Sequence, residues 1–206
     1  MESIIQNSIR KYLIHGPRSN KKLEILHDYI GKSIIGNLSK EYSYNSLPGK
    51  EINVTGKFYN KKVDICIKNN NDIKGIVSVK FVMSNFCQNS NNYFENLIGE
   101  MYNLKDIGAR MHVMIIFEDT PYYNKKGEII RYEKFKNIDR YDSLLCDGIL
   151  SDYIIIKISN GKSLLHPSKI GHDIDCSRFN IISEYPQSYE KCMEQFSMKL
   201  KSKISI

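Results

Sequence analysis

Residues 61–82, KKVDICIKNNNDIKGIVSVKFV, constrain the fold of this 206-residue chain more than any other stretch. Two runs rich in Val and Ile, 61–69 and 73–82, flank a turn of three Asn residues and one Asp. Such runs separated by a short polar turn predict a β-hairpin. Each run also holds a charge where an apolar residue would pack better, Asp64 in the first and Lys80 in the second. The hairpin therefore predicts part of the fold, and its two charged residues need a structural or functional explanation.

The other periodic segments predict an α/β fold with a central mixed β-sheet flanked by helices. Apolar residues at helical spacing predict amphipathic helices, and short apolar runs predict strands. The segment 51–59 adds a strand before the hairpin, which would give a three-stranded meander. The predicted elements are helices over 19–38, 92–108 and 185–204, and further strands over 51–59, 109–119 and 151–159. The length suits a single domain, 1–206.

Composition restricts the partners and the compartment. The chain has 30 Lys and Arg against 23 Asp and Glu, a formal charge of +7, which favours a polyanionic partner. Its five cysteines are scattered without a CxxC pair, so we expect neither a disulfide framework nor a zinc site, and a reducing cytoplasm fits best. No apolar run reaches the roughly 18 residues of a membrane span, and the N-terminus lacks a signal-peptide pattern.

Asp64 and Lys80 come to the same end of the sheet if their strands pair through the 68–72 turn. A carboxylate within an apolar strand is costly unless it is paired or bound to a metal. One interpretation is a structural ion pair with Lys80. The following helix supplies Glu95 and Glu100, and a second carboxylate near Asp64 favours a divalent cation, because Mg²⁺ prefers oxygen ligands.

The pattern D-(x13)-S-x-K-(x14)-E, on Asp64, Ser78, Lys80 and Glu95, resembles the PD-(D/E)xK nuclease superfamily. It is most similar to type II restriction endonucleases in which Ser or Thr replaces the first acid of (D/E)xK. In these enzymes a Glu on the following helix supplies the missing carboxylate. The expected order of helix, meander, helix and strand over 19–119 is similar to the core of that superfamily. Val63, not Pro, precedes Asp64.

The resemblance implies a restriction-endonuclease-like core over about 19–160 and a Mg²⁺ cofactor. Asp64 and Glu95 would hold the metal, Lys80 would orient or activate the water, and Ser78 would fill the position of the missing acid. Glu100 competes with Glu95 for the metal, since the two lie roughly 140° apart around a helix and only one can face Asp64. Superfamily members often bring a Glu from the first helix to the site, and Glu24 is a candidate for this role, although a solvated helix face explains it as well.

Several polar segments are candidate DNA contacts. Asn and Gln amides in 84–92 could pair with base edges or bind phosphates, or simply cap the next helix. The insertion 121–145 and the segment 166–180 are rich in basic and aromatic residues and could reach a groove, or could be decorated surface. The individual candidate DNA-binding residues are Lys61, Lys62, Ser84, Asn85, Gln88 and Asn89.

The resemblance thus implies a type II restriction endonuclease that hydrolyses phosphodiesters of double-stranded DNA and leaves 5′-phosphate ends. A palindromic target would require a homodimer, and a restriction system implies a companion DNA methyltransferase. The alternatives are a structure-selective repair or junction nuclease of the same superfamily, a non-catalytic nucleic-acid-binding module, and an effector nuclease that acts on RNA.

Overall fold

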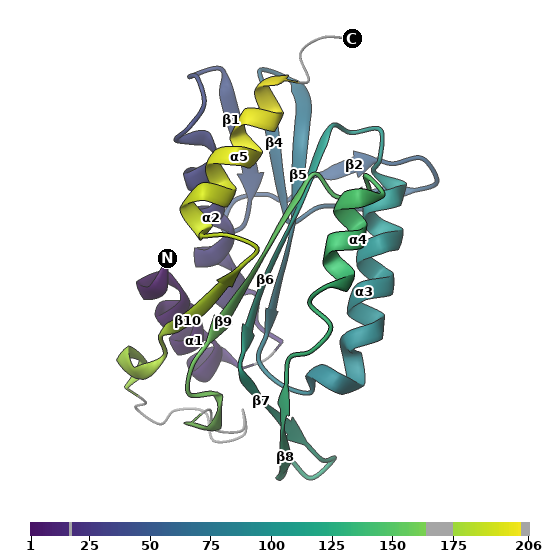
Figure 1. Cartoon of the computed structure of the whole chain (residues 1–206). Coiled ribbons are helices and arrows are strands. Elements are labelled where there is room, and N and C mark those ends of the chain that lie inside the picture. Colours follow the sequence, from purple (N-terminus) through teal and green to yellow (C-terminus); the bar gives the residue numbers. More distant parts are fainter. Residues whose placement is uncertain (17, 164–174, 203–206) are drawn as a thin grey trace.

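The computed structural model describes residues 1–16, 18–163 and 175–202, and confirms an α/β fold (Figure 1). The helices are α1 (Glu2–His15), α2 (Lys21–Ile35), α3 (Phe86–Asn103), α4 (Arg140–Cys146) and α5 (Tyr189–Ser202), with short 3-10 turns at Gly161–Ser163 and Cys176–Arg178. The strands are β1 (Tyr42–Ser46), β2 (Asn53–Thr55), β3 (Asn60–Lys62), β4 (Ile65–Asn69), β5 (Asp72–Val82), β6 (Ala109–Phe117), β7 (Asp119–Tyr123), β8 (Ile129–Lys134), β9 (Asp152–Ile158) and β10 (Ile181–Tyr185).

A six-stranded mixed sheet of order β1-β4-β5-β6-β9-β10 forms the centre of the molecule. β4 and β5 pair antiparallel through the Asn-rich turn, where Asn70 has a φ of 53°, so the predicted hairpin is confirmed. β5 then pairs parallel with β6, and β6 with β9. The parallel pairs need crossover connections, and these contain α3 and α4. β5 therefore has a hydrogen-bonded neighbour on each side, which fixes the backbone that carries Ser78 and Lys80.

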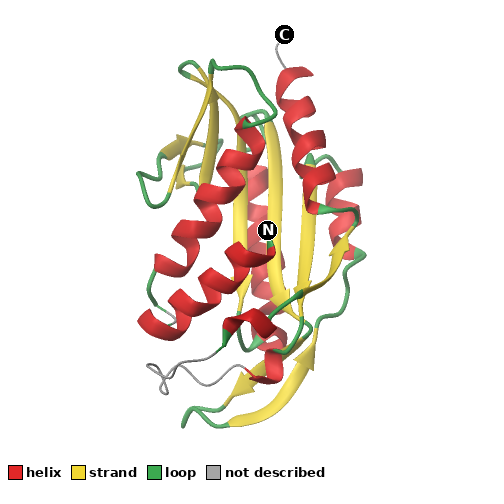
Figure 2. Cartoon of the chain, turned by 90° about the vertical axis from the view of Figure 1, so that its left-hand side faces the viewer, coloured by secondary structure: helices red, strands yellow, loops and turns green. Residues whose placement is uncertain are grey.

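Helices cover both faces of this sheet and create two cores. Apolar residues of α1, α2 and α5 pack on one face, and apolar residues of α3 and α4 pack on the other. Figure 2 shows the first group of helices lying across the strands. β6 and β9 are buried along nearly their whole length, as the continuous apolar runs at 109–119 and 151–159 predict.

The remaining strands form two small ribbons outside the main sheet. β2 and β3 pair as a hairpin beside the C-terminal end of α3 (Figure 1). β7 and β8 pair as a second ribbon that projects beyond the lower end of the sheet in Figures 1 and 2. The predicted insertion 121–145 consists of this ribbon, which begins at Asp119, followed by α4.

Several predicted boundaries are wrong. The expected strand 51–59 is only β2, and the third strand of the main meander is β1, which pairs with β4. The expected strand 61–69 divides into β3 and β4, with a bend between them at Val63 and Asp64. α3 begins at Phe86 and ends at Asn103, so most of the polar stretch 84–92 is helical. Most of the segment 166–180 lies outside the described residues.

Within the described ranges, no helix combines the length and the apolar character that crossing a membrane requires.

Candidate active site

Asp64 occupies the bend between β3 and β4, and not the interior of a strand as the sequence predicts. Its side chain is half-buried, and its Oδ2 accepts a hydrogen bond from the backbone N–H of Val79 on β5 at 2.8 Å. This bond holds the carboxylate against the neighbouring strand. The position also lowers the cost of the charge, because one oxygen is hydrogen-bonded and the residue remains partly solvated.

Ser78 and Lys80 lie on the face of β5 that α3 and α4 cover. Alternate residues of a strand point to opposite faces, and the neighbours Val77 and Val79 belong to the core on the other face. Ser78 is buried, whereas Lys80 is half-buried. Ser78 and Lys80 therefore share one face of the sheet with Cys66, which lies two positions after Asp64.

Lys80 and Asp64 do not form the structural ion pair that the sequence left open. Within the described chain, no ion pair joins their side chains, and Asp64 bonds instead to the backbone of Val79. Lys80 nevertheless acts electrostatically on Glu100 and on His112. Its ammonium group is thus close to the other charged groups of this region without being neutralised by Asp64.

Glu100 is the helix carboxylate that the fold brings toward Asp64. Its side chain is only 13% exposed and forms an ion pair with Lys61 Nζ at 3.3 Å. Burial raises the pKa of Glu100; the Lys61 charge opposes this rise and the Asp64 charge adds to it, with Lys80 also opposing. These interactions place Glu100 within electrostatic range of both Asp64 and Lys80.

Glu95 has no interaction with Asp64, Lys80 or Glu100 among the described residues. It is exposed on α3, and within the described chain no hydrogen bond or ion pair involves it. Glu95 and Glu100 are five residues apart, so they lie on different sides of the helix. The assignment of Glu95 as a metal ligand remains a prediction, but Glu100 is the residue that the structure brings to the site.

His27 and Glu51 are two residues of the region that the sequence prediction missed. His27 lies on α2, is fully buried, and has no hydrogen-bond partner on either ring nitrogen within the described chain. Burial lowers its pKa; the charges of Asp64 and Glu51 oppose this, and Lys80 adds to it. His27 follows Leu23 by four residues and precedes Ile30 by three, so a histidine within the apolar stripe of α2 was the available signal.

The remaining acid candidate, Glu24, lies one turn before His27 on α2 and is half-buried. Its carboxylate is within electrostatic range of His15 on α1. No interaction of Glu24 with Asp64 is found among the described residues. Glu24 therefore remains a prediction without structural support.

The predicted phosphate-binding lysines are both engaged in ion pairs. Lys61 pairs with Glu100, and Lys62 pairs with Glu51 at 2.8 Å. Both acids are largely buried, with side chains 13% and 14% exposed, whereas Lys62 is 64% exposed. The β2–β3 hairpin thus supplies a positive rim to the acidic region.

The polar stretch after Lys80 mainly fixes the start of α3. Asn85 adopts a left-handed conformation, its Oδ1 accepts from the N–H of Tyr123 at 2.8 Å, and its own N–H donates to Pro121 O. Asn89 donates to the Asn85 carbonyl. Gln88 is exposed, and Ser84 is half-buried. Of the individually named amides, that of Gln88 belongs to an exposed side chain, and in the rest of the stretch 84–92 Asn91 and Asn92 are exposed as well.

The groups near Asp64 that could contact a metal ion include carboxylates, whose oxygen atoms are the donors that Mg²⁺ prefers. No group of three or more His, Cys, Asp or Glu side chains that could hold a metal occurs among the described residues. Mg²⁺ is commonly bound by one or two carboxylates, with water and substrate phosphate completing the octahedron. Asp64 and Glu100, two carboxylates in electrostatic range of each other, match that requirement.

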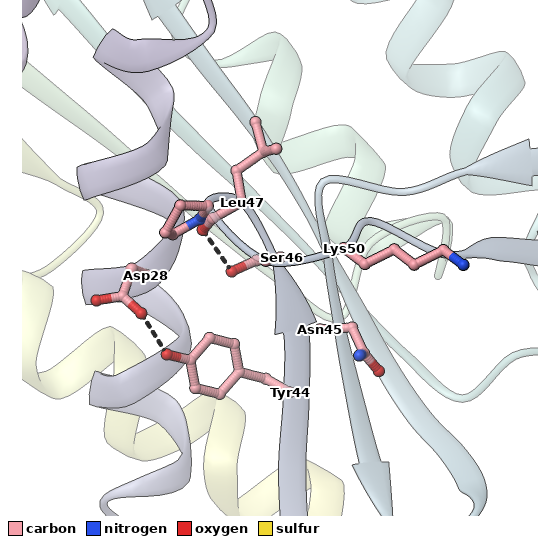
Figure 3. Close-up of a pocket in the computed structure, with 8 residues that line it drawn as sticks. Asp28, Tyr44, Asn45, Ser46, Leu47 and Lys50 are labelled. Carbon is pink, nitrogen blue, oxygen red and sulfur yellow. Dashed lines mark hydrogen bonds between the residues drawn. The ribbon is translucent and has the colours of Figure 1, made fainter.

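A separate open pocket of about 240 Å³ lies at the end of β1 beside α2 (Figure 3). Its acid, Asp28, accepts from Tyr44 Oη at 2.5 Å and pairs with Lys32 at 2.7 Å. Figure 3 shows Asp28 and Tyr44 turned toward each other and Lys50 pointing away. The pocket contains none of the residues around Asp64, and its one acid is already neutralised.

Comparison with known proteins gives no relative: no protein-family model, no curated protein and no solved structure matches the chain. Function must therefore be inferred from the arrangement of Asp64, Ser78, Lys80 and Glu100.

Proposed function

We propose that the protein is a Mg²⁺-dependent DNA endonuclease related in mechanism to type II restriction endonucleases. The observation that carries the proposal is that Asp64 and Lys80 both interact electrostatically with Glu100. Lys80 forms no ion pair with Asp64 in the described chain, and Asp64 bonds instead to the Val79 backbone. In a purely structural ion pair, Asp64 would neutralise the charge of Lys80. A lysine in electrostatic range of Glu100, with no ion pair to Asp64 in the described chain, suits phosphodiester hydrolysis.

Asp64 and Glu100 would hold the metal, which when bound polarises a phosphoryl oxygen and lowers the pKa of a coordinated water. Lys80 orients the attacking water and offsets the negative charge that develops on the phosphate. The water oxygen forms a bond to phosphorus, the bond from phosphorus to the 3′ oxygen breaks, and a proton passes to that oxygen. The products are a 5′-phosphate and a 3′-hydroxyl.

Ser78 takes the position of the acid that the resemblance leaves vacant. It is buried on the same face of β5 as Lys80. We propose that its hydroxyl positions a water molecule or the lysine, and not that it attacks phosphorus. Cleavage at a palindrome would require two such sites in a homodimer, and a restriction role would require a companion methyltransferase to protect host DNA.

The first test is digestion of mixed plasmid and phage DNA with Mg²⁺, with EDTA, and with Lys80→Ala in Mg²⁺. We expect discrete fragments that disappear in both controls. Intact DNA from folded protein in Mg²⁺ and in Mn²⁺ would refute the nuclease proposal. A continuous smear would refute site specificity while retaining hydrolysis.

A matched pair of variants then tests the ligand assignment. Glu100→Gln is expected to lower the cleavage rate by at least about 100-fold, since it removes one of two carboxylates from a centre of charge stabilisation. Glu95→Gln alters an exposed acid on the same helix, and we expect a rate close to wild type. The reverse pattern would assign the metal to Glu95.

A further inference from the structure

A cluster of two aromatic rings and two lysines is exposed where the β2–β3 loop meets the end of α3. We call Lys57, Phe58, Tyr102 and Lys105 the aromatic–lysine cluster. The Phe58 and Tyr102 rings stack with centroids 6.3 Å apart and an interplanar angle of 21°. Phe58 is 65% exposed and Tyr102 is 44% exposed. These large apolar surfaces are therefore displayed to solvent and not used in either core.

The two lysines lie against the rings. Lys57 Nζ is 5.3 Å from the Phe58 centroid and 5.7 Å from the Tyr102 centroid, and Lys105 Nζ is 5.0 Å from the Tyr102 centroid. These distances fall within the range of cation–π contact. Aromatic faces and positive charges thus occur together within one small patch.

Asn103 holds the loop of this cluster in place. Its buried side chain accepts from the N–H groups of Phe58 and Tyr59 at 2.9 and 3.3 Å, and donates to the Tyr59 carbonyl at 3.0 Å. Its backbone carbonyl accepts from the N–H of Lys57 at 2.7 Å. The approach is so close that a Cβ at Gly56 would lie 2.1 Å from Asn103 Nδ2. The backbone that presents Phe58 is therefore fixed before any partner binds.

This combination matches the chemistry of unpaired nucleotides. Proteins bind single strands by stacking bases on aromatic rings while cations track the phosphates. A duplex hides its base faces, so it could use only the lysines. A purely apolar protein partner would leave both ammonium groups buried and unpaired, which is costly. The charge of +7 on the whole chain also favours a polyanion.

We propose that the aromatic–lysine cluster binds unpaired nucleotides of a DNA strand, with a base stacked on Phe58 and phosphates held by Lys57 and Lys105. The inference rests on the proposed nuclease function in naming DNA as the ligand, and adds a binding site for unpaired nucleotides beside the site that would cut the duplex. The same hairpin carries Lys61, the ion-pair partner of Glu100. A strand held at the cluster would therefore lie close to the proposed active site.

Binding is measured in EDTA, so that the result does not depend on cleavage. The probes are a fluorescein-labelled oligothymidylate and a duplex of equal length, followed by anisotropy. We expect tighter binding of the single strand, and a loss of about tenfold in single-strand affinity with Phe58→Leu, which keeps an apolar side chain but removes the ring. Tyr102→Phe keeps the ring and is expected to bind as wild type does.

Ile182→Ala, at a 45% exposed position on β10, is the control for an unrelated exposed apolar residue. A single strand containing 2-aminopurine reports stacking directly, and we expect its fluorescence to be quenched by wild type and not by Phe58→Leu. Equal affinity for both probes, or an unchanged affinity in Phe58→Leu, would overturn the inference. So would a change of oligomeric state in Phe58→Leu without a change in DNA binding, which would make the cluster a contact between copies.

The outcomes separate the two proposals. If single-strand binding depends on Phe58 and the DNA stays uncut in Mg²⁺, the inference is supported and the nuclease proposal is refuted. If cleavage requires Lys80 and Phe58→Leu does not change binding, the nuclease proposal is supported and the inference is refuted.

Discussion

His112 offers a quantitative test of the buried face that carries the proposed site. It pairs with Ser78 across β5 and β6 and is 1% exposed. Its ring stacks on Tyr141 with centroids 5.8 Å apart and an interplanar angle of 3°. Burial lowers the pKa of His112 to about 3, with the Lys80 charge acting in the same direction and the Ser78 backbone opposing it.

The sign and size of the effect follow from proton uptake. An unfolded histidine titrates near pKa 6.5, so on acidification the unfolded chain takes up a proton that folded His112 refuses. The contribution of His112 to the free energy of unfolding is therefore fully present above about pH 6.5 and is lost as the pH decreases toward 3. Between about pH 7.5 and pH 5, roughly 1.5 pH units lie below the pKa of the unfolded histidine. Each unit lowers the free energy of unfolding by about 1.36 kcal/mol, so His112 alone lowers it by about 2 kcal/mol.

Urea unfolding followed by circular dichroism across this pH range provides the measurement. His112→Leu changes stability at every pH, so the informative quantity is the difference between the two pH profiles. Because His27 and the carboxylates titrate in both proteins, their contributions cancel in this difference. Wild type should lose about 2 kcal/mol more than His112→Leu between pH 7.5 and pH 5. Parallel profiles would show that His112 is not held neutral, and the burial argument would fail.

Two further predictions concern Arg110 and Asn103, buried polar side chains that hold loops in place. Arg110 is buried and donates to four backbone carbonyls in the loops 105–108 and 148–149, so Arg110→Met should lower the free energy of unfolding by about 3 kcal/mol. Arg110→Lys should recover little of this loss, because one ammonium group cannot span both loops; full recovery in urea melts would contradict it. Asn103→Leu removes three hydrogen bonds to the loop 56–59 and should cost about 2 kcal/mol and speed proteolysis within that loop, whereas unchanged proteolysis would show that the loop is held by other contacts.

The sequence predicts the fold where local pattern and burial agree. The Asn-rich turn and its two apolar runs give the β4–β5 hairpin, and the apolar runs at 109–119 and 151–159 give β6 and β9. β1, with the sequence YSYNS, lacks an apolar alternation and becomes a strand because it pairs with β4 at the sheet edge. α1 was missed although Ile5 and Ile9 stand at helical spacing, so its signal was present in the sequence.

The choice between Glu95 and Glu100 depends on tertiary packing. The apolar stripe of α3 is wide, and the sequence does not say which part of it contacts the sheet. The structure buries Leu97 and Met101, whereas Phe94 is only partly buried. The inward direction is thereby turned toward Glu100 and away from Glu95. A prediction from spacing alone could reach the helix but not this rotation.

Three buried charged groups elsewhere in the molecule are satisfied, although other buried polar atoms, such as Ser8 Oγ, have no hydrogen-bond partner among the described residues. Arg110 donates to four carbonyls, Asp152 binds Lys199 at 2.8 Å, and Glu133 binds Arg131 and the N–H of Cys87. Each of these groups has partners that offset its desolvation. They explain structure, and they need no further role.

His27 differs from these groups, whereas Glu100 keeps an ion pair with Lys61 and Asp64 accepts a hydrogen bond from Val79. His27 is fully buried without a hydrogen-bond partner in the described chain, Glu100 has a pKa raised by burial, and Lys80 is not paired with Asp64. An unsatisfied buried polar group costs about 1–3 kcal/mol, against a total stability of about 5–15 kcal/mol for a typical domain. Local rules of this kind are usually broken at functional sites. Removing such a group by His27→Leu should therefore raise the free energy of unfolding, and under the nuclease proposal it should slow cleavage. A variant that is both less stable and fully active would show that His27 belongs to the core and not to the site.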